Sequence, residues 1–86
     1  MYPKELLDRE PEYDTAEWHE WKEECRAVVE ERSGGKAWTT REVEAEFEIE
    51  GFLAPICYGK RRSDGKRIYL DFTHSPRFYF NLTVKE

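Results

Sequence analysis

The chain has 86 residues, of which 38% are charged and 15% aromatic, and a formal net charge of −5. This length fits one small domain that buries about 60–65% of its unfolded surface. The clustered aromatic residues argue against a disordered chain. The longest apolar run, residues 52–57, is far below the roughly 18 residues of a membrane span, and the N-terminus has no apolar stretch typical of a secretion signal. We expect a single α+β domain over residues 1–86, in the cytoplasm and away from membranes.

The charge is divided unevenly along the sequence. Residues 1–50 carry 16 acidic and 7 basic side chains, a net charge of −9. Residues 51–86 carry 3 acidic and 7 basic side chains, a net charge of +4. Such asymmetry indicates either a charged partner or neutralisation of one half of the molecule by the other.

The N-terminal segment is weakly specified, and the helix that follows it is strongly specified. We expect little order in residues 1–13 beyond one turn of helix that Pro3 can begin. A helix is predicted over residues 15–32, with Asp14 as N-cap and Glu17 completing a capping box. Its apolar residues recur at helical spacing: Trp18, Trp21, Cys25, Val28 and Val29. The glycines after Ser33 are suited to end the helix.

Residues 39–50 carry two conflicting signals. Thr39 and Glu42 form a second capping-box pattern, which predicts a helix. From Val43 to Glu50, however, apolar residues alternate with glutamates, which is strand periodicity. We therefore predict a short helix over residues 40–46 that passes directly into a strand.

The rest of the chain has the signals of a three-stranded antiparallel meander, with strands at about 47–60, 66–73 and 77–84. A three-residue loop, Ser63-Asp64-Gly65, brings the largest apolar residues onto one face, because it pairs Tyr58 with Leu70. Pro55 lacks a backbone donor, so the first strand is expected at an edge or bulged. The predicted core is Ile56, Tyr58, Ile68, Leu70, Phe72, Phe78, Phe80 and Leu82.

No constellation of residues predicts catalysis, a metal or a cofactor. His19 and Glu23 are spaced as a metal pair on a helix, but a zinc site needs further ligands that the sequence does not supply. Asp71, His74 and Ser75 are triad residue types, yet no nucleophile elbow accompanies them. An enzyme with a pocket between helix and sheet is the least favoured hypothesis.

One surface of the predicted sheet combines basic and tyrosine side chains. Its candidate binding residues are Arg61, Arg62, Lys66, Arg67, Tyr69, Arg77 and Tyr79. Tyrosine and arginine on an open sheet are typical of single-stranded nucleic-acid binding, although basic hairpins also protect sheet edges. The favoured hypothesis is a non-catalytic protein-binding module, or one that forms a homodimer through its charge asymmetry or an edge strand. Nucleic-acid binding is the alternative.

Overall fold

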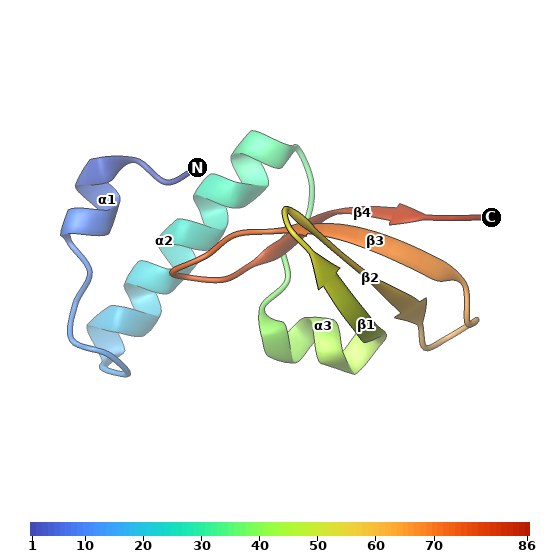
Figure 1. The fold of residues 1–86 in the computed structure, drawn as a ribbon. Coiled ribbons are helices and arrows are strands. Elements are labelled where there is room, and N and C mark those ends of the chain that lie inside the picture. The colour runs from blue at the N-terminus through green and yellow to red at the C-terminus, as the bar shows by residue number, and fades with distance from the viewer.

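A computed structural model describes all 86 residues and shows three helices and a four-stranded antiparallel sheet. The elements are α1 (Lys4–Asp8), α2 (Ala16–Ser33), α3 (Thr40–Glu46), β1 (Phe47–Leu53), β2 (Ile56–Arg61), β3 (Arg67–Phe72) and β4 (Tyr79–Val84). The strands lie in the order β1-β2-β3-β4. The molecule is elongated, 41 × 22 × 20 Å, with α1 and α2 at one end and the sheet extending away from them (Figure 1).

The α+β class is confirmed, but the number of strands differs from the prediction. The segment predicted as one strand over residues 47–60 is two strands, because the chain turns at Ala54 and Pro55. Pro55 thus lies in a turn instead of within a strand. β1 is an edge strand, as expected, and its register shifts between Ile49 and Gly51, away from Pro55 where a bulge was expected.

Both predicted helices form, with one difference at a cap. The N-cap of α2 is Thr15, whose hydroxyl accepts the N–H of Trp18 at 3.1 Å, and not Asp14. Asp14 instead has a φ of 64° and lies 2.8 Å from the His19 ring nitrogen. At the other end Gly34 adopts the left-handed conformation, with a φ of 77°, as the glycines predicted.

The predicted capping box of α3 is present. The Thr39 hydroxyl accepts the N–H of Glu42, and the Glu42 carboxylate accepts the N–H of Thr39 at 3.0 Å. The chain leaves the helix at Phe47, whose φ and ψ of −130° and 149° are extended. This direct passage from α3 into β1 accounts for the two conflicting sequence signals.

The N-terminal segment is held against the rest of the chain more firmly than its sequence indicated. Leu6 in α1 is buried, and the Trp21 indole donates to the Leu6 carbonyl at 2.7 Å. The Tyr2 hydroxyl donates to the Pro76 carbonyl at 2.8 Å and lies 2.9 Å from the Thr73 hydroxyl. Residues distant in sequence therefore order this segment.

The core consists of two hydrophobic clusters on opposite faces of the sheet. The helix cluster contains Leu6, Trp21, Cys25, Val29, Ala37, Phe78 and Phe80. The sheet cluster contains Trp38, Val43, Phe47, Cys57, Ile68, Leu70 and Tyr79. Since neighbouring strand residues point to opposite faces, Tyr79 faces α3 while Phe78 and Phe80 face α2. The prediction that Phe78 and Phe80 share a face with Ile68 and Leu70 was wrong.

The predicted register of the β2–β3 hairpin was wrong by one residue. Cys57 lies opposite Leu70 and Tyr58 opposite Tyr69, and the loop between the strands has four residues instead of three. A slip of one residue inverts the faces of a strand, so Ile56 and Tyr58 point away from the sheet cluster. Phe72 and Leu82 are only partly buried at its margin.

The physical reason for the register is the small size of Gly59. A Cβ atom there would collide with the Glu48 backbone carbonyl of β1. The β1 backbone beside Gly59 therefore leaves no room for a side chain at this position of β2. The prediction had placed the largest residues of β2 on the face that carries Gly59 and Cys57.

Candidate functional site

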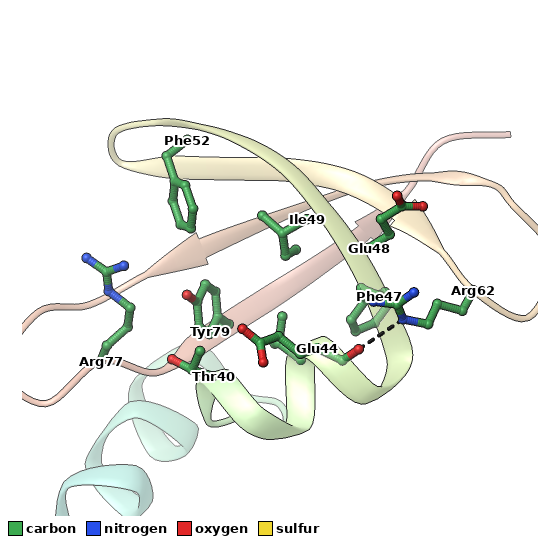
Figure 2. A pocket seen from close by; sticks show the side chains of 10 residues that line it. Thr40, Glu44, Phe47, Glu48, Ile49, Phe52, Arg62, Arg77 and Tyr79 are labelled. Atoms are coloured by element: carbon green, nitrogen blue, oxygen red, sulfur yellow. Dashed lines mark hydrogen bonds between the residues drawn. The ribbon is translucent and has the colours of Figure 1, made fainter.

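A groove of about 530 Å³ lies between α3 and β1 (Figure 2). The groove exists because α3 runs directly into β1, and the two elements diverge at an angle from Phe47. The ten lining residues are Thr40, Val43, Glu44, Phe47, Glu48, Ile49, Phe52, Arg62, Arg77 and Tyr79. Half of them are apolar or aromatic, a composition typical of ligand grooves.

The apolar part of the groove belongs mainly to β1. Ile49 and Phe52 point from β1 toward α3, and Tyr79 of β4 lies between the two elements (Figure 2). Phe52 is 51% exposed, and its neighbour Leu53 at the end of the strand is 69% exposed. Large exposed apolar side chains beside a groove are more typical of an interaction surface than of a solvated strand end.

The outer edge of β1 has no strand beside it. β1 pairs only with β2, and its bulge lies at Glu50. Unpaired backbone groups at a sheet edge can accept a further strand. The groove and this edge share the same residues of β1, so an added strand would place alternate side chains toward α3.

Arg77 lies at the open end of the groove and is held by aromatic rings. Its guanidinium carbon is 5.0 Å from the centroid of the Phe72 ring and 5.5 Å from that of Phe52. One amino group lies 3.2 Å from Nδ1 of His74. No carboxylate is within 4.0 Å of this guanidinium, whereas Arg9, Arg26, Arg61 and Arg67 each form an ion pair.

The other end of the groove carries Arg62 (Figure 2). The Arg62 Nε–H donates to the backbone carbonyl of Glu44 at 2.9 Å, which ties the β2–β3 loop to α3 (Figure 2). Glu44 and Glu48 also line the groove, and the Glu44 carboxylate points away from Arg62, toward Tyr79 and Thr40 (Figure 2). The groove therefore has a cation at each end, Arg77 and Arg62, and two glutamates among its lining residues (Figure 2).

The residues predicted for one binding face lie in three different places. Arg67 and Tyr69 lie on the face of the sheet opposite the sheet cluster, which we call the open face. Tyr58 lies opposite Tyr69 on this face. Tyr79 is 3% exposed and lies on the other face, so the prediction that it joins Tyr69 was wrong. Arg62 and Arg77 line the groove.

The remaining two, Arg61 and Lys66, lie at the β2–β3 loop. The Arg61 guanidinium donates to the Asp64 carboxylate, which also accepts the N–H of Lys66. These contacts, that of Arg61 first, lower the pKa of Asp64 to about 2. Arg61 is therefore engaged in shaping the loop.

The open face is less basic than its sequence indicated. Glu50 lies 3.3 Å from Arg67 and 3.7 Å from Lys60, so one carboxylate faces both cations. Glu50 lies in the bulge of β1, beside these two cations. The strand alternation of residues 43–50 gave no sign of this contact.

Sequence reasoning missed the groove itself. The sequence predicted Glu44 only as part of a short helix, and Ile49 and Phe52 only as parts of the strand that follows it. A usable signal was present in the capping box that runs into a strand, because a helix joined to a strand without a loop must diverge from it at an angle. Which residues of α3 and β1 face each other across that angle, however, depends on the packing of Tyr79 between them.

No helix of the chain is both long enough and apolar enough to cross a membrane. No group of three or more histidine, cysteine, aspartate or glutamate side chains is arranged to hold a metal ion. Comparison of the chain with protein-family models, with curated proteins and with solved structures finds no match.

Proposed function

We propose that the chain is a non-catalytic protein-binding module that takes an extended segment of another protein into the groove between α3 and β1. The observation that carries this proposal is the free edge of β1 beside an apolar groove lined by the same strand. Addition of a strand to a sheet edge derives affinity from backbone hydrogen bonds and specificity from pockets for alternate side chains. Phe52 and Leu53 add exposed apolar area at one end.

A second copy of the chain is a poorer occupant than another protein. An antiparallel pair of two β1 strands centred on Ile49 would place Glu48 of one copy opposite Glu50 of the other. Like charges directly opposite each other destabilise a strand pair.

The test is selection of binders from a random peptide library displayed on phage. Peptides of about twelve residues are long enough to cover β1. We expect selected peptides to shift the backbone amide resonances of β1 and α3 in the ¹⁵N-labelled protein. Substitution Ile49→Arg fills the groove and should weaken binding at least tenfold, whereas Thr83→Arg on the exposed part of β4 should not.

Two outcomes would contradict the proposal. The first is peptide binding that Ile49→Arg leaves unchanged while its circular dichroism spectrum matches that of the unsubstituted protein. The second is a stable dimer, measured by light scattering, whose interface protects the β1 amides from exchange. In that case the occupant of the groove is a second copy.

Nucleic-acid binding is the second candidate, favoured by the pairing of Tyr58 with Tyr69 on the open face next to Arg67. Stacking on such rings is the usual mode for single strands. Glu50 and the net charge of −5 oppose it. A fluorescent oligothymidylate in about 50 mM salt tests it. We expect no binding; binding that weakens in Arg67→Ala would favour this candidate instead.

A further inference from the structure

We propose that the C-terminal half of β4 is a self-association surface, through which two copies of the chain pair in antiparallel orientation. Thr83 of one copy lies opposite Thr83 of the other on the two-fold axis, and Leu82 lies opposite Val84. This inference goes beyond the proposed function, because it concerns the sheet edge remote from the groove. Two four-stranded sheets become one continuous sheet, and the β1 edge of each copy stays free at its ends.

The outer edge of β4 is the second free edge of the sheet. β4 pairs only with β3, and the bridge between Trp38 and Tyr79 covers only its first residue. The rest of the strand extends away from the helices (Figure 1), and the register shift at Asn81 leaves a regular edge after it. Edge strands are usually protected from pairing by charged side chains. β1 carries glutamates, whereas residues 80–84 carry no charge.

The ladder between β3 and β4 determines which backbone groups of β4 point outward. The Lys85 N–H donates to the Arg67 carbonyl at 2.8 Å, toward β3. Because hydrogen-bonded and non-hydrogen-bonded positions alternate along an antiparallel strand, the N–H and C=O of Val84 point to the free edge, as do those of Leu82. When Leu82 of each copy lies opposite Val84 of the other, all these groups have partners, and the two Thr83 residues meet between them.

The side chains are compatible with this pairing on both faces of the sheet. Leu82 and Val84 are half-buried beside the sheet cluster, so their contact across the axis covers apolar surface that a single copy leaves exposed. Thr83 is exposed on the open face, opposite Tyr69. Two threonines directly opposite each other form a favourable cross-strand pair. Since two β1 strands would instead bring glutamates together, β4 is the edge suited to a second copy.

Opposite charges also complement each other in this register. The Asp71 carboxylate accepts the side-chain N–H of Asn81 at 2.9 Å, and both residues line a hollow of about 490 Å³ beside Thr83. Neither Asp71 nor the exposed Lys85 forms an ion pair within the chain. The partner's Lys85 lies opposite Asn81, two strands from Asp71, or about 10 Å between backbones. Its long, flexible side chain can direct the ammonium group toward this carboxylate.

The experiment measures the mass of three proteins by sedimentation equilibrium: the unsubstituted chain, Thr83→Arg and Thr83→Glu. We expect the unsubstituted chain to form a dimer in which the amide hydrogens of Leu82 and Val84 are protected from exchange. Each variant brings two like charges together on the axis and should weaken the dimer by at least about tenfold. An equimolar mixture of the two variants should restore the dimer, because opposite charges then meet at the axis.

Ile49→Arg in β1 is the control and should leave the dimer intact. Circular dichroism of each variant checks its fold, and Thr83 is exposed. Three results would overturn the proposal: an unsubstituted chain that stays monomeric up to about 1 mM, a mixture of the two Thr83 variants that stays monomeric, or a dimer that Ile49→Arg dissociates. The first two can occur while peptides still bind the groove of Thr83→Arg, which leaves the proposed function standing. Loss of peptide binding without loss of the dimer does the reverse.

Discussion

The backbones of Trp38 and Tyr79 are joined by two hydrogen bonds: Trp38 N–H donates to Tyr79 at 2.7 Å, and Tyr79 N–H donates to Trp38 at 2.8 Å. This bridge covers the outer edge of β4 where the strand begins. It also places the connection between α2 and α3 against the sheet. The edge beside the groove, that of β1, is left without a partner.

The Trp38 side chain should contribute to the free energy of unfolding through the volume that it fills and not through its indole N–H. It is 7% exposed, its ring centroid is 5.8 Å from that of Phe47, and its indole nitrogen has no hydrogen-bond partner. We expect Trp38→Ala to lower the free energy of unfolding by about 3–5 kcal/mol. Trp38→Phe should cost much less, because no hydrogen bond is lost. Urea unfolding of both variants checks this, and equal losses would contradict it.

Gly59 should not tolerate a side chain. A Cβ atom at this position meets the Glu48 carbonyl, and backbone cannot move aside as a flexible side chain can. We expect Gly59→Ala to lower the free energy of unfolding by at least the 1–3 kcal/mol typical of overpacking. Gly35→Ala is the matched control, since nothing lies within 4 Å of that site. Thermal unfolding that is the same for both variants would show that the Glu48 carbonyl does not lie close to Gly59.

The cap of α3 should make stability depend on acid pH. The N–H of Thr39, and after it the Arg26 guanidinium, hold the pKa of Glu42 below its ordinary value of 4.5. A carboxyl group with a lowered pKa stabilises the fold above that value, and the contribution is lost as the pH falls through the folded pKa. Since the Glu42 side chain is 43% exposed, solvent screening limits the effect.

Glu42→Gln separates this contribution from other acid effects, because glutamine keeps an acceptor for the Thr39 N–H but does not titrate in this range. We expect the variant to be less stable than the unsubstituted protein near neutral pH. The difference should shrink as the pH falls below about 4.5. Urea unfolding across this range measures it, and a difference independent of pH would contradict the assignment.

Tyr2 should make stability depend on alkaline pH. Burial raises the pKa of its phenol from 10.0 to about 12, against a lowering by the hydrogen bond with Thr73. The raised pKa means that the neutral phenol stabilises the fold below pH 10, and that this contribution is lost as the pH rises toward 12. Tyr2→Phe removes its hydrogen bonds and should cost about 0.5–1.5 kcal/mol near neutral pH. The variant should then lose less stability than the unsubstituted protein between neutral and alkaline pH. Urea unfolding at both pH values would measure this difference.

Both cysteines should be unreactive in the folded protein. Cys25 and Cys57 are fully buried, in the helix cluster and the sheet cluster respectively. Burial raises the pKa of the Cys25 thiol to about 11 and also raises the pKa of the Cys57 thiol. A thiol reagent reacts with thiolate, so we expect no labelling in native buffer and two labelled thiols after denaturation. Rapid native labelling of either cysteine would show that its cluster opens.

Local signals were reliable at most helix ends, although the N-cap of α2 is Thr15 and not the predicted Asp14. The capping box of Thr39 and Glu42, and the glycine after Ser33, correctly predicted where helices begin and end. These features depend on hydrogen bonds within three or four residues and on backbone sterics, both of which the sequence contains directly.

Register and faces were not determined locally. The expectation that large apolar residues share a face put Tyr58 with Leu70. Instead Cys57 lies opposite Leu70, and Gly59 lies where the Glu48 carbonyl leaves no room for a Cβ atom. In β4 the alternation also fails, because Asn81 has a φ of 55° and the register shifts beside it. Both effects arise from contacts between segments, which no single segment encodes.

The sequence by itself thus determined the helix α3 and its passage into a strand, the edge position of the first strand, and the presence of Arg62 and Arg77. Only the tertiary structure decided that these features form one groove. The packing of Tyr79 against the face of α3, and of Phe52 and Phe72 around Arg77, brings them together. Such contacts depend on the relative placement of whole elements, which is fixed by the close packing of side chains between them.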